Sequence, residues 1–359
     1  MQPRILFRTH YQVDEPAHME FLVKLCTSPV QSRYREVVAR KLSEEITTRR
    51  RKKLNEDAGA YAVDLGKDLG LLTENHTWTE LGHLVGLIAE IQDGDWEEQI
   101  ALTLPERLLH FRIFLEADGA AFLHIGRCLM RDNILPSDLN WNSFAKEMFI
   151  AVYSEYLSHT TLTSDRVELQ QIIERIKLNG YQGNSGNHKC FIHMQALNRL
   201  GLVERVDPAE HKYRLPQLSP GKPSGVEILI KEIPDVFSLE KVVKSHCWIE
   251  VAAKVFQIAS TASDDDRAIL SLMVRYYEQI VSCGTPQCPL STLIEATQIE
   301  LLAKRSRLLT HNVATKVIMA AQKQSPKDVR FHVDRHGKPA FMKLSDTFVA
   351  RYADYEVVE

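Results

Sequence analysis

The sequence predicts a mainly helical protein with small β-hairpins, which places it in the α+β class. Residues 97–130 and 141–158 repeat their apolar side chains every three or four positions, as amphipathic helices do. The stretch RLGLVERVDPAEHKYRL (199–215) has the pattern of a helix end, a glycine stop and two strands joined by a polar turn. With 359 residues, of which 44% are hydrophobic, the chain is long enough for two or three domains.

The N-terminal part is expected to form one small module followed by connector helices. Helical apolar spacing extends over 18–46, and LGLL at 69–72 closes a further helix with glycine and begins a strand. The stretch TENHTWTELGHL then supplies a turn and the start of the next helix. The connector helices at 97–130 and 141–158 are separated by turn-forming residues around Pro136.

A compact unit of helix, turn, helix and hairpin follows at residues 164–216. Its second helix carries a buried stripe, formed by Cys190, Met194, Leu197 and Leu200. The other face of this helix is expected to meet solvent, with His188, Lys189, Phe191, Ile192, His193, Gln195 and Arg199. Gly201 can adopt the left-handed conformation that ends a helix, Asp207 begins the polar turn, and Tyr213 suits the returning strand.

The last third of the chain is expected to repeat this plan after a linker. The linker QLSPGKPSG (217–225) is rich in Pro, Gly and Ser, and a helical stretch follows it to about Ser260. Ser263 is expected to cap the next helix. A capped helix beginning HNVATKV and a hairpin with the turn DRHGK come last, and the first strand alternates Val329, Phe331 and Val333 with Arg330 and His332.

The helix that ends in LGLV and is followed by a hairpin resembles the winged-helix superfamily. The resemblance covers Ser164–Pro216 well, while Gly59 and Gly66 interrupt the corresponding helix of the first module, and the third module lacks the LGL step. It implies tandem winged-helix modules joined by connector helices. The expected segments are module 1 at 1–95, a helical connector at 96–163, module 2 at 164–217, a linker and helix at 218–262, and module 3 at 263–359.

Positive charge is concentrated in two blocks, although the net charge is −3. Residues 33–53 carry a charge of +6 and residues 304–343 a charge of +8, so the remainder carries about −17. In the helix-turn-helix arrangement that the resemblance implies, a recognition helix enters the DNA major groove while the wing touches the backbone or the minor groove. A helix and a wing that are both basic can neutralise several phosphates with little choice of sequence.

The third module is therefore the expected site of contact with double-stranded DNA. Its candidate residues are Lys304, Arg305, Arg307, Lys316, Lys323, Arg330, Arg335, His336, Lys338 and Lys343. Asn312, Thr315 and Gln322 are candidates for additional base or sugar contacts. A second candidate patch is formed by Arg49, Arg50, Arg51, Lys52 and Lys53. The alternative for both blocks is a solvated basic surface with no ligand.

A different class of function is a scaffold or interaction subunit. Phe191 and Ile192 are two adjacent large apolar residues on a helix face meant for phosphates, and they favour a protein contact or packing against the connector helices. The acidic remainder of the chain favours the same interpretation. Such a subunit would belong to a larger nucleic-acid-processing, chromosome-maintenance or phage-defence complex, or it would self-associate.

The sequence offers no motif of an enzyme, and we expect no cofactor and no metal. It contains neither a Walker-type phosphate loop nor G-x-G-x-x-G, H-E-x-x-H or G-x-S-x-G. Glu210 and Lys212 form part of a nuclease pattern, but they lie in the expected wing and lack a further Asp on a neighbouring strand. The first residues mix charged and apolar types, and no apolar run approaches the length of a membrane span, so we expect a cytoplasmic protein with no membrane contact.

Overall fold

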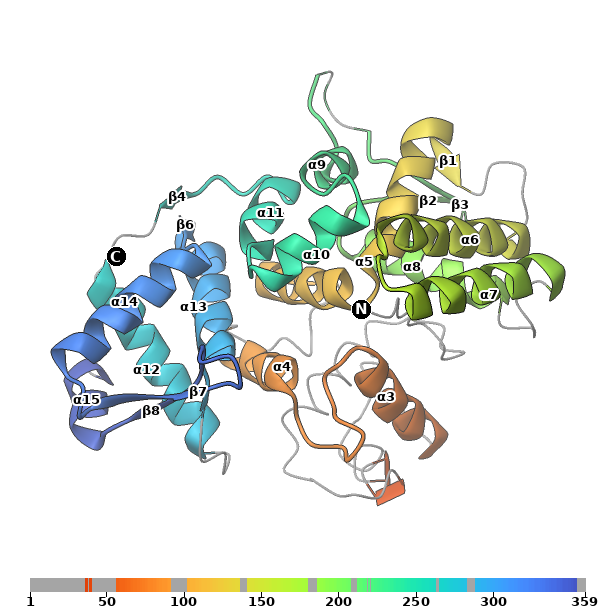
Figure 1. Cartoon of the computed structure of the whole chain (residues 1–359). Coiled ribbons are helices and arrows are strands. Elements are labelled where there is room, and N and C mark those ends of the chain that lie inside the picture. Colours follow the sequence, from red (N-terminus) through yellow and green to blue (C-terminus); the bar gives the residue numbers. More distant parts are fainter. Residues whose placement is uncertain are drawn as a thin grey trace. The chain divides into compact units, whose positions relative to one another are not determined.

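A computed structural model of the chain describes residues 36–37, 39–40, 56–91, 102–135, 141–179, 186–207, 212–217, 219, 221–262, 265–282 and 288–353. These residues are mainly helical with sheets of two and three strands, which confirms the α+β class (Figure 1). The chain divides into two compact units. The central unit contains His110–Gln257, and the C-terminal unit contains Ile258–Glu359 together with Met19–Gln99 and Thr103–Leu109.

Seven helices and one small sheet are described in the central unit. The helices are α5 (Leu104–Asp132, in this unit from His110 on), α6 (Trp141–His159), α7 (Thr163–Asn179), α8 (Gly186–Arg199), α9 (Gly225–Glu232), α10 (Val236–Lys244) and α11 (Trp248–Val255). The sheet consists of β1 (Ile134–Leu135), β2 (Glu204–Asp207) and β3 (Lys212–Arg214). Its strand order is β1-β3-β2, and both pairings are antiparallel.

Helix α8 ends as the sequence predicts. Gly201 has a φ of 74°, and its N–H donates to the carbonyl of Asn198. The N–H of Leu202 donates to the carbonyl of Leu197, which completes the pair of hydrogen bonds that defines a Schellman motif. Gly70, in the earlier LGLL stretch, has a φ of 72° and makes the same two kinds of bond. The two LGL stretches are therefore two copies of one helix stop.

The expected solvent face of α8 is wrong at His193 and Gln195, and the third described charged or polar member, Arg199, is half-buried with its terminal guanidinium nitrogens covered. His193 is fully buried and Gln195 is 5% exposed. The ring of His193 is hydrogen-bonded to the carboxylate of Asp118 and lies edge-on to Phe122, and both of these partners belong to α5. A connector helix thus covers the face that a free-standing module would expose to solvent.

Two further expectations for the central unit are corrected by the structure. The turn region after α5 contains β1, which pairs with β3 through Ile134↔Arg214 and Leu135↔Tyr213. The helical stretch that follows the linker is three short helices, because the chain breaks at Ile233 and again at Ser245. Ser224 begins the first of these helices with a reciprocal capping box.

The C-terminal unit combines described helices from the N-terminal part of the chain, α3 (Glu56–Asp68) and α4 (Glu80–Ile91) among them, with the last hundred residues. Further helices of this unit are α12 (Asp266–Ser282), α13 (Leu290–Arg305), α14 (His311–Gln324) and α15 (Asp346–Ala353). Its strands are β4 (Thr261–Ala262), β5 (Cys288–Pro289), β6 (Arg307–Leu308), β7 (Val329–Val333) and β8 (Pro339–Leu344). Strands β4 and β6 pair in parallel, and the second sheet has the antiparallel order β5-β8-β7.

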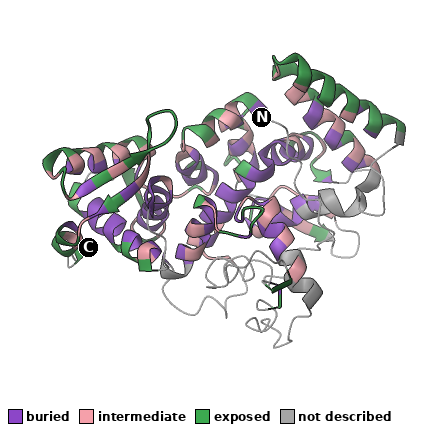
Figure 2. Cartoon of the chain, turned by 60° about the horizontal axis from the view of Figure 1, so that its bottom comes forward, coloured by how far each residue is buried: buried purple, intermediate pink, exposed green. Residues whose placement is uncertain are grey.

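Helix α13 forms the core of this unit. It contacts α4, α12 and α14, and its residues Leu293, Ile299 and Leu302 are fully buried. Figure 2 colours the chain by burial, with the buried segments in purple. The hydroxyl of Thr292 donates to the carbonyl of Glu80 at 2.9 Å, which fixes the start of α4 against α13. The following helix, α14, packs against α13 in this core.

Residues 56–91 of this unit form fewer strand pairings than the sequence predicts. Helix α3 is continuous through Gly59 and Gly66, and the expected strands reduce to one isolated bridge between Leu72 and Trp78. At the start of α12, the carboxylate of Asp265 accepts the N–H groups of Arg267 and Ala268. Ser263, the expected cap, lies outside the described residues.

Candidate nucleic-acid interface

Helix α14 presents one polar stripe to solvent. The hydroxyl of Thr310 accepts the N–H of Val313 and begins the helix. Its buried stripe, which faces the core, consists of Ala314, Val317, Ile318 and Ala321. Its exposed stripe consists of Asn312, Lys316, Ala320, Lys323 and Gln324. The two predicted lysines therefore lie on one solvent face together with Asn312.

The other two polar candidates on α14 are less available. The hydroxyl of Thr315 donates to the carbonyl of His311 one turn earlier, at 2.8 Å. Gln322 is half-buried. Of the three residues proposed for base or sugar contacts, Asn312 is the one that the structure places in the open.

The hairpin β7–β8 has one face toward the core and one toward solvent. The register pairs Val329 with Leu344 and Phe331 with Met342 on the core face. On the other face Arg330 is paired with Lys343, and His332 with Phe341. Arg330, His332 and Lys343 are exposed, whereas Phe341 is half-buried. Side chains alternate between the faces of a strand, so these four residues form one solvent-facing surface.

The pairing of Arg330 with Lys343 sets two positive charges directly opposite one another. Like charges in this position destabilise a hairpin. The guanidinium Nε of Arg330 donates to the uncharged carbonyl of Lys327 at 3.3 Å. In the described part of the chain, no carboxylate forms an ion pair with the six cations of this helix and hairpin, namely Lys316, Lys323, Arg330, Arg335, Lys338 and Lys343.

The hairpin turn is closed by Asp334. Its carboxylate accepts the backbone N–H groups of His336 and Lys338, at 2.8 and 2.9 Å, and Gly337 has a φ of 74°. The bond from Lys338 lowers the pKa of Asp334 below its usual value. The Nε of Arg335 donates to the ring of His336 at 3.0 Å. The turn therefore carries Arg335, His336 and Lys338 together at its tip.

The second acid of the basic block also has a structural role. Asp328 accepts a hydrogen bond from the hydroxyl of Ser345 at 2.8 Å, at the open end of the hairpin. The two acidic side chains of the block thus secure the two ends of the hairpin, while its cations remain on the solvent side.

The remaining three predicted residues lie at the corner between α13 and α14. Ser306 ends α13 with a φ of 51°, and the exposed Arg307 donates to the hydroxyl of Thr261 at 2.8 Å. Lys304 is exposed, and Arg305 is half-buried. The parallel bridge between β4 and β6 anchors this corner.

Three side chains of this surface were missed by the sequence analysis. Lys327 is exposed beside the start of β7, and its carbonyl receives the bond from Arg330. His332 follows from the alternation along β7, which the sequence shows. Phe341 could not be assigned to the same face without the register across the turn.

The other predicted sites cannot be placed. Arg49, Arg50, Arg51, Lys52 and Lys53 lie outside the described residues. Phe191 and Ile192 belong to α8, but their side chains lie outside the described part of the structure.

Within the described ranges, no group of three or more His, Cys, Asp or Glu side chains could hold a metal ion. None of the helices described has both the length and the apolar character required to span a bilayer. Comparison of the chain with models of protein families, with curated proteins and with solved structures finds no match.

Proposed function

We propose that the C-terminal unit binds double-stranded DNA with little sequence preference. The contacts would come from the exposed stripe of α14 and from the solvent face and turn of the hairpin β7–β8. The observation that carries the proposal is the opposition of Arg330 and Lys343, since a phosphate placed between them would turn a repulsion into two attractions.

The order of the elements supports a winged-helix interpretation of this unit. Helix α12, strand β5, helices α13 and α14, and strands β7 and β8 occur in this order along the chain, with the two-residue strand β6 of the other sheet between α13 and α14, and the sheet order is β5-β8-β7. By analogy, α14 takes the place of the recognition helix, and the hairpin takes the place of the wing. The analogy concerns the fold, so the function is argued from the charged side chains themselves.

The kind of side chain favours phosphates over base edges. Lysines and arginines dominate the surface, and Asn312 and Gln324 are the exposed amides on α14. Cations at phosphates give affinity that falls steeply with salt but carries no sequence information. We therefore infer a non-enzymatic protein that holds duplex DNA by its backbone.

The proposal is tested by reversing charge at Lys316, Arg335 and Lys338, which lie on the helix and in the turn. Binding of a labelled random-sequence duplex is measured by fluorescence anisotropy. The triple variant to Glu is expected to lose binding at a salt concentration where the unaltered chain binds. A matched variant, Lys222→Glu with Lys231→Glu, changes two exposed lysines of the central unit and is expected to bind as before. Unchanged binding in the triple variant would refute the proposal.

A scaffolding role in a larger complex remains the second proposal. It rests on the acidic balance of the chain outside its two basic blocks. The central unit supplies a more specific argument for a protein partner.

A further inference from the structure

A groove runs along α10 in the central unit. It consists of two adjoining cavities of about 440 and 220 Å³, and both are lined by Tyr156, Val236 and Glu240. The larger cavity lies between α10 and the middle of α5, at residues 115–119. The smaller lies between α10 and the end of α6, and continues to Asp165 in α7.

The walls of the groove are largely apolar. The larger cavity is lined by Leu115, Ala117, Leu239 and Val243 in addition to Val236. At the smaller cavity Phe237 is 62% exposed and Leu162 is 63% exposed, and the ring of His159 stacks on Phe237. Two neighbouring large apolar side chains that are left this exposed are typical of a protein-binding surface.

The charged residues that the structure describes in the lining of the groove are all acidic. Glu116, Asp118 and Glu240 line the larger cavity, and Asp165 lines the smaller one, whereas no lysine or arginine of the described ranges lines either. Glu116 and Glu240 are partly exposed, and they pair with Arg112 and Lys244, which are not among the lining residues. Burial, together with the nearby carboxylates Asp118, Glu155 and Glu240, raises the pKa of Tyr156, so the phenol stays protonated and can donate a hydrogen bond.

One of the acidic residues that line the larger cavity, Asp118, is part of the protein core. Asp118 is 4% exposed, and it interrupts α5 with non-helical backbone angles, φ −153° and ψ 37°. Its carboxylate is held by the ring of His193 in α8. The Asp118 side chain is 2% exposed, so its carboxylate is committed to His193, and the accessible negative charge of the larger cavity comes from Glu116 and Glu240.

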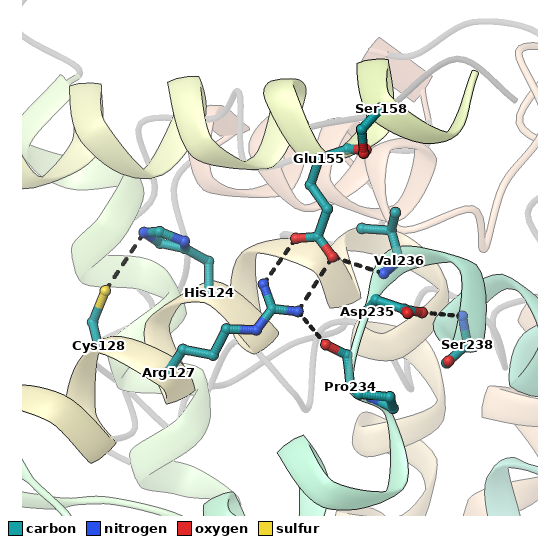
Figure 3. Close-up of polar contacts among 9 residues, drawn as sticks. All are labelled: His124, Arg127, Cys128, Glu155, Ser158, Pro234, Asp235, Val236 and Ser238. Carbon is teal, nitrogen blue, oxygen red and sulfur yellow. Dashed lines mark hydrogen bonds and ion pairs between the residues drawn. The ribbon is translucent and has the colours of Figure 1, made fainter. Parts of the chain in front are cut away.

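The groove is also preformed, because a polar network fixes the start of α10 (Figure 3). Arg127 of α5 donates to both carboxylate oxygens of Glu155 in α6, at 2.8 and 3.2 Å, and to the carbonyl of Pro234 at 2.6 Å. Glu155 in turn accepts the N–H of Val236 at 3.0 Å, and Asp235 caps the helix by accepting the N–H of Ser238. Three elements therefore meet at one ion pair, and little reorganisation is needed for binding.

Close packing on the other side completes the wall. A Cβ atom at Gly119 would lie 2.8 Å from both methyl groups of Leu239, so α10 approaches α5 as closely as a glycine permits. Leu239 is thereby held as a fixed wall of the larger cavity.

We propose that this groove binds a segment of a partner protein that carries a lysine or arginine between large apolar side chains. The apolar stem of such a residue suits the walls, and its charged end suits the partly exposed Glu116 and Glu240. Large apolar side chains next to that residue would pack on Phe237 and Leu162, as the apolar face of an amphipathic helix packs into an apolar groove. The acidic lining disfavours nucleic acid at this site, so the proposal is independent of DNA binding by the C-terminal unit.

The probes for the test are two labelled helical peptides of about 12 residues. Both have leucines at every third and fourth position, and they differ in carrying either arginine or glutamate between them. Fluorescence anisotropy with the full chain is expected to show affinity at least about tenfold higher for the arginine peptide, because complementary charge is the basis of the selection.

Two substitutions in the groove are expected to weaken binding of the arginine peptide. Glu240→Lys reverses the charge at the residue shared by both cavities, and an affinity loss of about tenfold or more is expected. Phe237→Ala removes the exposed ring, and a several-fold loss is expected. Glu174→Lys is the matched control, because Glu174 is exposed on α7 and lines neither cavity; its affinity is expected to stay unchanged.

The outcomes that overturn the proposal are specific. Equal affinity for the two peptides, or an equal loss in Glu174→Lys and Glu240→Lys, would show that the groove does not select the cation. Self-association of the unaltered chain that is abolished by Phe237→Ala would assign the groove to a second copy. Glu240→Gln keeps the shape of the side chain and removes its charge, so its affinity for the arginine peptide is expected to lie between those of the unaltered chain and Glu240→Lys. This variant shows the effect of the charge even if Glu240→Lys folds poorly. All of these variants are expected to bind duplex DNA unchanged.

Discussion

Arg330 and Lys343 lie directly opposite one another on the solvent face of the hairpin β7–β8, and neither forms an ion pair with a carboxylate of the described residues. This arrangement costs the free protein stability, because like charges on facing strands repel. It also prepares a site for an anion. The facing cations of the hairpin therefore lower the stability of the free protein while they favour binding of an anion.

Lys343→Gln is expected to stabilise the free protein and to weaken its hold on DNA. Removing the repulsion from Arg330 should raise the free energy of unfolding by about 0.5 kcal/mol at low salt. Urea unfolding measures the first effect, and duplex binding measures the second. Lys323→Gln, which removes a cation of α14 that has no such facing charge, should weaken DNA binding without the gain in stability. A loss of stability in Lys343→Gln would contradict this account of the pair.

Two glycines of the C-terminal unit are expected to differ in their tolerance of alanine. Gly70→Ala introduces strain of about 1 kcal/mol, because φ is 72° there, but the added methyl meets open space. Gly82→Ala should cost clearly more, because its Cβ would lie 2.3 Å from the backbone carbonyl oxygen of Leu71. The order of the two unfolding free energies tests the packing of α4. Equal losses in the two variants would show that α4 does not approach the LGLL stretch this closely.

The stability of the central unit is expected to fall as the pH is lowered below about 6.5. Burial, together with the charge of Arg199, lowers the pKa of His110 to about 3, so this ring stays neutral in the folded chain while it takes up a proton in the unfolded chain. The unfolded state then binds more protons between these two values, and the free energy of unfolding falls with decreasing pH by up to about 1.4 kcal/mol per unit.

His110→Phe isolates this contribution. The ring of His110 already stacks on Phe114, with centroids 6.0 Å apart, so phenylalanine suits the site. Urea unfolding at pH 7.5, 6 and 5 should show a weaker pH dependence in this variant. An unaltered pH dependence would mean that other groups account for it.

The stabilising role of the hairpin turn can be tested at Asp334. Asp334→Asn retains an oxygen that can accept the N–H groups of His336 and Lys338, whereas Asp334→Ala removes it. The hairpin should therefore be less stable in the alanine variant than in the asparagine variant, and the amides of β7 and β8 should exchange faster in the alanine variant. Equal exchange in the two variants would show that Asp334 does not secure the turn.

The sequence predicted those features that depend on neighbouring residues. The left-handed glycine at position 201 and the turn DRHGK follow from local backbone preferences, and both are present. The solvent stripe of α14 also follows from spacing, because its cap and its buried residues are close in sequence. The ten basic candidates of the C-terminal unit are exposed, apart from the half-buried Arg305.

The features that depend on distant residues were missed. His193 was assigned to solvent because its helix looks amphipathic in isolation, and the burial comes from Asp118 and Phe122, about seventy residues earlier. Strand β1 has two residues and no period, so its pairing with β3 is visible only in the fold. The facing of Arg330 and Lys343 needs the strand register, and the groove along α10 needs three helices that are separated in sequence.

The most direct test of the central claim is the salt dependence of duplex binding by the variant Arg330→Gln with Lys343→Gln. The logarithm of the binding constant is measured against the logarithm of salt concentration, from about 50 to 200 mM. If the two residues contact phosphates, the slope should become shallower by about 2 relative to the unaltered chain, and affinity should fall equally for duplexes of different sequence. An unchanged slope and affinity would contradict the account, because the facing cations of the hairpin would then contact no DNA.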